Sequence, residues 1–331
     1  MSGGNKYMSP KNRVSSFLRS LLTEYFIIPL YVIIFTGLGL NSPQYFFSYD
    51  ALMNILVYLT SLLTLSLAQS LVIITGNIDL SIIGIAGFTA YMGWLLNVVY
   101  GLPAFIVFPV MILLGAAWGV FNGFMVRKVG VPALVQTLSV MFILYGFLLV
   151  ATGGTSLGGF SPDYVWLGSA TILNIRLMVL VVLPLVCLLG FYLIHLSKFG
   201  LRLCFVGGNP TAAFLVGINV DRTVMLAFTL SGALSGLAGF LTSSRLGIIT
   251  TFFGRELLMP SIAAPVIGGV SLSGGEGSFI GVLFGCLLMQ TISTGLVAIG
   301  VSAWYIDIVN GCIILIAVAI DAIRRKRLLK A

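Results

Sequence analysis

The sequence predicts an all-α polytopic membrane protein that crosses the bilayer about ten times, with cytoplasmic N- and C-termini. Its 331 residues are 59% hydrophobic and 8% charged, whereas an ordinary soluble domain carries about 25% charged residues. The mean hydropathy is +1.13. Long apolar stretches recur along the chain, and Lys and Arg residues gather between alternate stretches. These observations indicate a multi-pass topology.

Ten apolar stretches are candidates for membrane crossing, because about 20 apolar residues are needed to cross a hydrocarbon core of about 30 Å. In chain order they cover residues 24–40, 51–74, 83–100, 103–126, 133–152, 176–196, 223–244, 257–270, 278–298 and 302–322. The eighth stretch is the short one. Residues 1–22 are basic and polar and lack a small-residue cleavage site, so we expect a retained cytoplasmic N-terminal segment rather than a removable signal.

The basic residues orient these stretches, because Lys and Arg prefer the cytoplasmic flanks of membrane helices. If the chain starts inside and crosses ten times, every basic cluster falls on the cytoplasmic side. The clusters are Lys6, Lys11, Arg13 and Arg19; Arg127 and Lys128; Lys198, Arg202 and Arg222; and Arg324, Arg325, Lys326, Arg327 and Lys330. Residues 23–323 then form the transmembrane domain and 324–331 a basic cytoplasmic tail. The net charge of +8 fits contact with anionic lipid headgroups, and its spread among helix flanks does not favour nucleic-acid binding.

One acid, Asp79, stands in the connection between the second and third stretches, where the chain reads Thr-Gly-Asn-Ile-Asp-Leu-Ser-Ile-Ile-Gly. Such a residue is either a solvated loop carboxylate or part of a permeation pathway. It also suits a helix N-cap or an acceptor that stabilises the fold. We therefore single out Asn77 and Asp79 as residues with a pathway or structural role.

The internal connection 197–222 is longer than a hairpin requires and predicts a short helix of its own. Gly207 and Gly208 form a turn, Asn209 is an N-cap candidate, Pro210 occupies the first helical position, and Gly217 ends the helix. Such a helix either contacts a cytoplasmic motor or lies at the membrane interface with its apolar residues in lipid. Ala212 and Ala213 are small enough to allow a partner to approach closely.

Two further connections are rich in turn-forming residues. The external segment Thr152–Ile175 is either a docking surface or a solvated connection. The segment Gly268–Gly277 holds five glycines, which permit tight turns. It lacks the Lys-Ser/Thr ending of a phosphate-binding loop, and the chain has no such motif elsewhere. ATP and Mg²⁺, if they drive this protein, are expected in a partner chain, and this chain is expected to hold no cofactor.

The sequence offers no sign of catalysis or metal binding. The four cysteines, Cys187, Cys204, Cys286 and Cys312, lie far apart, and we expect neither a disulfide framework nor a metal site. His195 lies at a helix end, where a cation suits the helix dipole. No nucleophile or paired carboxylate accompanies it, so we expect no enzyme activity.

Polar groups within membrane helices are costly and usually face the bundle interior or a cavity. This criterion selects Gln69, Gln136, Thr137 and Gln290 as candidates for the pathway. The wider set also includes Asn54, Ser70, Asn122, Thr291, Ser293 and Asn310. Packing between helices explains many of the hydroxyl residues equally well.

Five segments together resemble the ribose/xylose-type permease subunits of bacterial ABC sugar importers. They are residues 75–81, 130–138, 207–220, 229–232 and 267–277, which read TGNIDLS, GVPALVQTL, GGNPTAAFLVGINV, TLSG and IGGVSLSGGEG. The resemblance covers roughly residues 45–320. It implies a ten-helix subunit of the bacterial inner membrane that pairs with a second, identical or homologous, permease subunit. It also implies a periplasmic sugar-binding protein and a cytoplasmic tandem-cassette ATPase, with 197–222 as the coupling loop.

The sequence departs from that family pattern at two places. The usual Gly-Gly-Ile-Asp-Leu-Ser-Val-Gly is replaced at 76–83 by a version with two fewer glycines that keeps Asp79. The usual Glu-Leu-Asp-Ala-Ile-Ala-Ala is replaced at 258–264 by Leu-Met-Pro-Ser-Ile-Ala-Ala, which lacks both carboxylates. The Leu-Met-Pro variant is similar to one permease subunit of autoinducer-2 importers. It leaves open both the sugar carried and whether the dimer is made of identical chains.

We therefore expect an inner-membrane permease subunit that translocates a monosaccharide or a similar neutral polyhydroxylated solute. The scarcity of charge within the membrane favours a neutral solute. Coupling to the ATPase is expected at Gly208, Asn209, Ala212, Ala213 and Gly217. The alternative is an ion-coupled secondary sugar transporter, which ordinarily carries intramembrane carboxylates or discontinuous helices that hold the ion. Only Asp79 is available for that role.

Overall fold

The computed structural model describes residues 27–328. Its α-helices are α2 (Ile27–Asn41), α3 (Pro43–Phe46), α4 (Tyr49–Ile74), α5 (Ile82–Trp94), α6 (Ala104–Phe124), α7 (Ala133–Thr152), α8 (Pro162–Ser169), α9 (Leu183–Phe191), α10 (Lys198–Gly208), α11 (Pro210–Leu215), α12 (Val220–Leu246), α13 (Arg255–Ile267), α14 (Phe279–Ala298) and α15 (Ala303–Leu328). Four π-helical segments extend them, at η1 (Leu95–Val99), η2 (Met125–Val129), η3 (Met178–Val182) and η4 (Tyr192–Leu196). The predicted segment 1–22 and the last three residues of the predicted tail lie outside the described residues.

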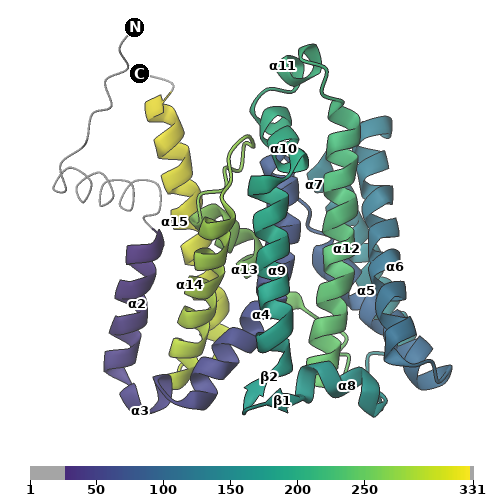
Figure 1. Cartoon of the computed structure of the whole chain (residues 1–331), viewed down its shortest axis with the longest axis vertical. Helices are drawn as coiled ribbons and strands as arrows, with labels where there is room; N and C mark the ends of the chain where they lie inside the picture. Colours follow the sequence, from purple (N-terminus) through teal and green to yellow (C-terminus); the bar gives the residue numbers. More distant parts are fainter. Residues whose placement is uncertain (1–26, 329–331) are drawn as a thin grey trace, which may run out of the picture.

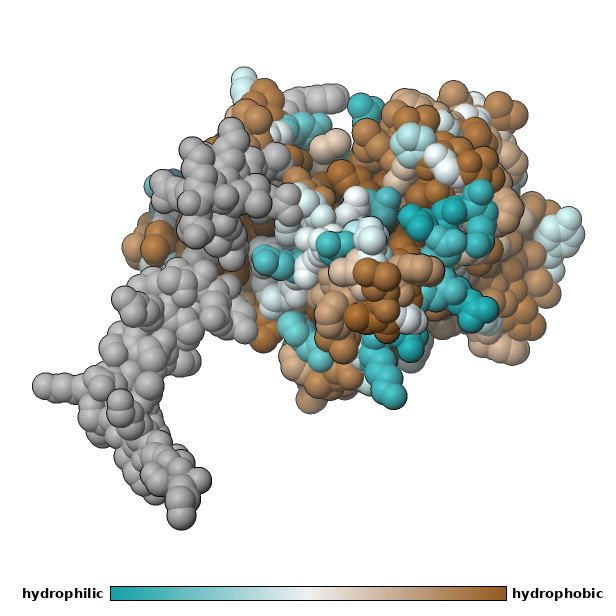
Figure 2. Space-filling model, turned by 90° about the horizontal axis from the view of Figure 1, so that it is seen from above, coloured by the Kyte–Doolittle hydropathy of each residue, from teal (hydrophilic) through white to brown (hydrophobic). Residues whose placement is uncertain are grey.

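Among the residues that the structure describes, seven helices are long and apolar enough to cross a membrane. They span Tyr49–Ile74, Ile82–Val99, Ala104–Val129, Ala133–Thr152, Met178–Leu196, Val220–Leu246 and Phe279–Ala298. The other three predicted stretches fall on α2, α13 and α15, whose crossing of the membrane stays a prediction. Most of the long helices stand side by side, with α11 at one end of the molecule and the β1–β2 hairpin at the other (Figure 1). Viewed from the α11 end, hydrophilic residues gather across the middle, and hydrophobic residues cover much of the outer sides (Figure 2).

The helix α4 lies at the centre of the bundle, because 94% of the residues in its most apolar 18-residue stretch are buried. Next to it, α6 and α12 pack with their backbones in contact. A Cβ atom at Gly115 would overlap the carbonyl of Gly232, and one at Gly119 would overlap the carbonyl of Phe228. Small residues on facing helices allow this close approach within a membrane. The α6–α12 pair therefore depends on glycine at these positions.

The connections 75–81 and 268–278, which both contain glycine, meet inside the bundle. The amide of Gly275 donates to the carbonyl of Ile74, the last residue of α4, at 2.9 Å. Gly76 has a φ of +79° and lies beside the carbonyl of Ser273. Gly207 of α10 packs on the same place, since a Cβ there would overlap both Ile74 and Gly275. The connections 75–81 and 268–278 and the helix α10 thus share one backbone junction.

The segment Thr152–Ile175, which we predict to be external, is more ordered than a solvated connection, because it contains α8 and most of the hairpin formed by β1 (Thr171–Ile172) and β2 (Ile175–Arg176). Tyr164 is fully buried, and its hydroxyl lies 2.8 Å from Ser243 Oγ of α12. Asp163 Oδ2 accepts from the amide of Ala104 at 2.7 Å and so satisfies the start of α6. This bond to the Ala104 amide holds the pKa of Asp163 below its usual value.

Candidate functional site

Asp79 lies inside the bundle and joins the connection 75–81 to α12. Its Oδ1 accepts from the amide of Ser81 at 3.0 Å and from Ser81 Oγ at 2.5 Å. Its Oδ2 accepts from Ser231 Oγ at 2.9 Å. Ser231 stands 11 residues into α12, about 16 Å along the helix axis, and Asp79 has no exposed surface. Asp79 is therefore buried in the bundle and is not a solvated loop residue.

The polar network continues from Ser81 to α6 and α7. Asn122 donates from Nδ2 to Ser81 Oγ at 2.8 Å, and Gln136 donates from Nε2 to Asn122 Oδ1 at 3.3 Å. Asn122 is fully buried and Gln136 is 6% exposed. The structure thus links two of the predicted residues, Asp79 and Gln136, through Ser81 and Asn122. Four segments of the chain meet in this network.

Thr137, a third predicted residue, fixes the backbone of the same connection. Its hydroxyl accepts from the amide of Leu80 at 3.1 Å. It also lies within donating distance of two carbonyls, at 2.8 Å from Ala133 and 3.3 Å from Ile78. Because Thr137 is fully buried and its three partners are half-buried, their pairing avoids the cost of an unsatisfied polar group. The arrangement positions the connection and offers no nucleophile or acid-base pair.

Asn77 lies outside the Asp79 network. Its Nδ2 donates to Thr75 Oγ1 at 3.0 Å and to the Thr75 carbonyl at 3.3 Å, and the side chain is half-buried. These bonds close a local turn after α4. The structure therefore places Asn77 as a turn residue on the same connection as Asp79.

Gln69 and Gln290 occupy different parts of the molecule. Gln69 is fully buried in α4, and neither polar atom of its side chain has a hydrogen-bond partner among the described residues. Gln290 is half-buried on α14 and donates from Nε2 to Thr294 Oγ1 at 3.3 Å. It lines a cavity of about 460 Å³ together with Asn54 and Asn310. Neither Gln69 nor Gln290 therefore contributes to the Asp79 network.

The predicted short helix is present as α11. Asn209 Oδ1 accepts from the amide of Ala212 at 3.0 Å, Pro210 occupies the first turn, and Gly217 has a φ of +84°. These features begin and end the helix as the residue types predict. The helix projects at the end of the molecule next to α10 (Figure 1).

The surface of α11 differs from the predicted coupling set at one position. Gly208, Asn209, Ala212 and Gly217 are exposed, but Ala213 is 1% exposed and packs into the core. On a helix, adjacent residues point in different directions, so the two alanines cannot share one face. Ala213 therefore supports α11 from beneath and does not contribute to an exposed docking surface.

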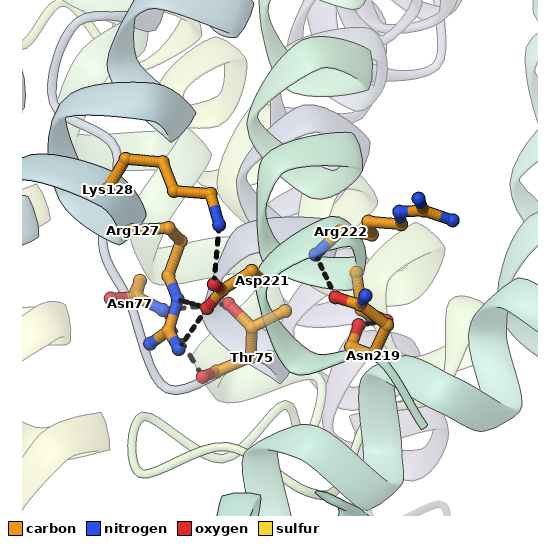
Figure 3. A network of polar contacts seen from close by, with 8 residues as sticks. Thr75, Asn77, Arg127, Lys128, Asn219, Asp221 and Arg222 are labelled. Atoms are coloured by element: carbon orange, nitrogen blue, oxygen red, sulfur yellow. Dashed lines mark hydrogen bonds and ion pairs between the residues drawn. The ribbon is translucent and has the colours of Figure 1, made fainter. Parts of the chain in front are cut away.

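An ion-pair cluster beside α11 was not expected from the sequence. Asp221 at the start of α12 pairs with Arg127 Nη2 at 2.6 Å and with Lys128 Nζ at 3.0 Å (Figure 3). Arg127 and Asp221 also line a groove of about 560 Å³ that runs along Pro210 and Phe214 of α11. The signal that could have found this pair is the position of Asp221, which lies two residues before the predicted stretch 223–244 and on the same predicted cytoplasmic side as Arg127 and Lys128. In the part of the chain that the structure describes, no cluster of His, Cys, Asp or Glu could hold a metal ion.

Comparisons with known proteins agree with this architecture. Residues 51–318 match the family described as branched-chain amino acid transport system / permease component. The chain is 35% identical over 288 residues to the autoinducer 2 import system permease protein LsrC of Enterobacter sp. (strain 638). The aligned region covers 87% of this chain and 83% of that protein. It is 32% identical over 315 residues to LsrC proteins of Yersinia pseudotuberculosis (serotype O:1b, strain IP 31758) and Yersinia pestis (strain Pestoides F), covering 94% of this chain and 85% of each relative. No solved structure matches the chain at a significant level.

The matched region covers most of the chain and contains the Asp79 network, α11 and the seven apolar helices, except for the first two residues of α4. The relatives are permease subunits of importers and not enzymes. The chain therefore belongs to this permease family, as a multi-pass inner-membrane subunit of a bacterial ABC importer.

Proposed function

We propose that this permease translocates a monosaccharide or a similar neutral polyhydroxylated solute, which a periplasmic binding protein delivers and a separate cytoplasmic ATPase drives. The relatives carry autoinducer 2 import in their names, so autoinducer 2 is the first solute to test here. In this proposal the chain crosses the membrane ten times, and both termini and α11 lie in the cytoplasm. A second permease subunit, identical or homologous, completes the pathway.

The observation that carries the proposal is the form of α11. Three consecutive large apolar side chains, Phe214, Leu215 and Val216, are 71%, 78% and 70% exposed. They stand beside the groove that Arg127 and Asp221 line. An exposed apolar group rimmed by charged residues is typical of a protein interaction site. Its place beyond the helix bundle suits contact with a motor outside the membrane.

The contacts of α10 support a route from that surface to the pathway. The helix α10 leads directly into α11, and Gly207 of α10 packs against Ile74 and Gly275. A displacement of α11 toward or away from the ATPase therefore reaches the junction of the two glycine-containing connections. In this mechanism ATP binding by the partner moves 197–222, and the pathway changes the side to which it opens.

Copurification tests the partnership. The permease is co-expressed with a tandem-cassette ATPase and a periplasmic binding protein encoded beside its gene. We expect the ATPase to copurify with the tagged permease, and the loaded binding protein to stimulate ATP hydrolysis by the complex. A permease that purifies without the ATPase and still accumulates solute from an ion gradient would show that it is a secondary transporter.

A further inference from the structure

The half of the molecule that carries the β1–β2 hairpin holds a cavity between α4, α13, α14 and α15, lined by apolar side chains and a few polar ones. Its volume is about 460 Å³, within the range of about 300–1,000 Å³ of small-molecule sites. The start of α4 lies at this end, because the Tyr49 hydroxyl donates to the Asn174 carbonyl in the hairpin turn. If α11 is cytoplasmic, the cavity lies toward the periplasmic side. The Asp79 network does not contribute to its walls.

A small number of polar side chains in the cavity wall can form hydrogen bonds with a ligand. Three amides, Asn54, Gln290 and Asn310, face it together with the carboxylates Glu256 and Asp307. Asn310 is 4% exposed, and its Oδ1 has no hydrogen-bond partner among the described residues. A buried carbonyl oxygen without a partner costs free energy unless a ligand or water donates to it. The cavity wall therefore includes a residue with a buried acceptor that has no partner among the described residues.

The charges of the wall select the class of ligand. The described residues that line the cavity include two carboxylates and neither Lys nor Arg. An amino acid or a phosphorylated sugar would bring its anionic group into this wall without a cation to pair with it. A neutral polyol, in contrast, donates hydroxyl hydrogens to carboxylate and amide oxygens and accepts from the amide N–H groups. Tyr58 also lines the cavity, and the guanidinium of Arg245 lies over its ring, 3.9 Å from the ring centroid.

The residues at the inner end of the cavity indicate where a solute would move next. Leu62 and Met289 line it and are each 1% exposed. Gln69 lies seven residues beyond Leu62 on α4, which is two turns along the same helix face and about 10 Å deeper. It is the fully buried amide whose polar atoms find no partner in the described part of the chain. A solute that passes Leu62 and Met289 meets this second unpaired amide.

We propose that this cavity is the periplasmic-side binding site for a small uncharged polyol, and that Gln69 is the polar group that receives the solute after the Leu62–Met289 constriction. The proposal rests on the proposed import function and deepens it by assigning the residues that hold the solute. Asn310 and Gln290 are the binding residues whose loss is expected to matter most. Glu256 and Asp307 exclude anionic solutes.

Cysteine protection tests the site without ATP. Ser293, a half-buried residue of the wall, is replaced by Cys in the purified full-length permease whose four natural cysteines are removed. Autoinducer 2, D-ribose and D-xylose are each added before a neutral methanethiosulfonate reagent. We expect at least one polyol to slow the modification several-fold and L-valine to leave it unchanged. A matched Ser156→Cys variant in the exposed external segment is expected to react at the same rate with and without polyol.

Uptake by the reconstituted importer tests the same residues during transport. Asn310→Leu and Gln290→Leu are expected to lower uptake of the protecting polyol at subsaturating concentration about three- to tenfold, the effect of losing about one neutral hydrogen bond. Gln290 is half-buried, so this second variant keeps the test valid if Asn310→Leu does not fold. Gln44→Leu makes the same chemical change at an exposed position of α3 and is expected to leave uptake unchanged.

The outcomes separate the two proposals. Protection by L-valine but by none of the three polyols would overturn the ligand class. If neither L-valine nor any of the polyols slows the modification of Ser293→Cys, the site itself is overturned. Unchanged uptake by Gln290→Leu would also overturn the site, even if the wild-type importer works. If polyols protect Ser293→Cys but the wild-type complex shows no ATP-dependent uptake, the site stands and the import function fails.

Discussion

At the scale of single residues, Asp79 shows how a carboxylate is accommodated inside this bundle. No described residue forms an ion pair with it, so its charge is not compensated by a cation. Three hydrogen bonds from Ser81 and Ser231 satisfy its two oxygens instead. Such bonds offset part of the cost of burying a carboxylate. Asp79 therefore acts first as the acceptor that ties the connection 75–81 to α12.

Substitution of Asp79 distinguishes a structural role from a role of the charge. Asp79→Asn keeps an oxygen for Ser81, and its NH₂ group can donate to Ser231 Oγ, so we expect normal assembly and near-normal uptake. Asp79→Ala removes all three side-chain acceptor contacts, and we expect it to destabilise the folded protein by about 1–3 kcal/mol. Thermal unfolding of the purified variants, followed by size-exclusion chromatography, measures this difference. Full assembly of Asp79→Asn without uptake would show that the charge itself is needed for transport.

From the sequence we could predict which polar residues matter, but not which residues they contact. Asp79, Gln136 and Thr137 stood out because polar groups in apolar stretches are rare, and the structure places all three around one connection. Ala213 was assigned to the coupling surface because it is small, but its burial depends on packing that no local pattern reveals. Asp221 was missed because its partners lie more than 90 residues earlier in the chain.

At the scale of elements, the ends of α11 are determined by neighbouring residues in the sequence, whereas the position of α8 is determined by its packing against α12. The N-cap, proline and terminal glycine of α11 are all readable from adjacent residues. The helix α8 also begins with Ser161 and Pro162, but its eight residues are too short to show a clear period. Its position depends on the burial of Tyr164 against α12. The external segment was therefore predicted only as a solvated connection or a docking surface.

A large charged group on α11 is expected to block the ATPase. Ala212 is exposed next to the apolar residues of α11, so Ala212→Arg places a cation in the proposed interface. We expect insertion into the membrane to be normal, copurification of the ATPase to weaken at least about tenfold, and uptake to be lost, because a desolvated, unpaired charge costs more than about 1.4 kcal/mol. Ser156→Arg in the external segment is the control and is expected to retain both properties. Normal uptake and ATPase binding by Ala212→Arg would place the interface elsewhere.

The α6–α12 contact is expected to tolerate no side chain at its centre. A Cβ atom at Gly232 would overlap the backbone of Gly115 and Gly119, so Gly232→Leu forces the two helices apart. We expect a loss of at least about 1–3 kcal/mol of stability, measured as a lower thermal unfolding temperature or as loss of folded protein. Gly146→Leu on α7 makes the same change where an added Cβ would meet no atom within 4 Å beyond its own helix backbone, and it is expected to be neutral. Equal stability of the two variants would contradict the packing described.

At the scale of the whole molecule, the positions of the basic residues predict the topology. Single cysteines at Arg202, Arg327 and Ser156 are introduced into a cysteine-free chain and treated with a membrane-impermeant maleimide. We expect Ser156→Cys to react in intact spheroplasts, and Arg202→Cys and Arg327→Cys to react only after the membrane is opened. This pattern follows from the cytoplasmic preference of Lys and Arg. Reaction of Arg327→Cys from outside would place the C-terminus in the periplasm and contradict an even number of crossings from a cytoplasmic N-terminus.

The global arrangement was only partly predictable from the sequence. Hydropathy located each of the seven long helices because the bilayer sets their length. The junction of Ile74, Gly207 and Gly275 was not predicted, since it joins three segments far apart in the chain through backbone atoms alone. Glycine density marks a place where backbones approach closely, but it does not name the partner.

The most direct test of the permease function is solute uptake by proteoliposomes that contain the complete complex of permease subunits and ATPase. Autoinducer 2 and D-ribose are presented outside with the binding protein, and ATP and Mg²⁺ are enclosed inside. We expect accumulation of at least one solute that requires both ATP and the binding protein and that stops in Ala212→Arg. Accumulation driven by a proton or sodium gradient without ATP would contradict the assignment.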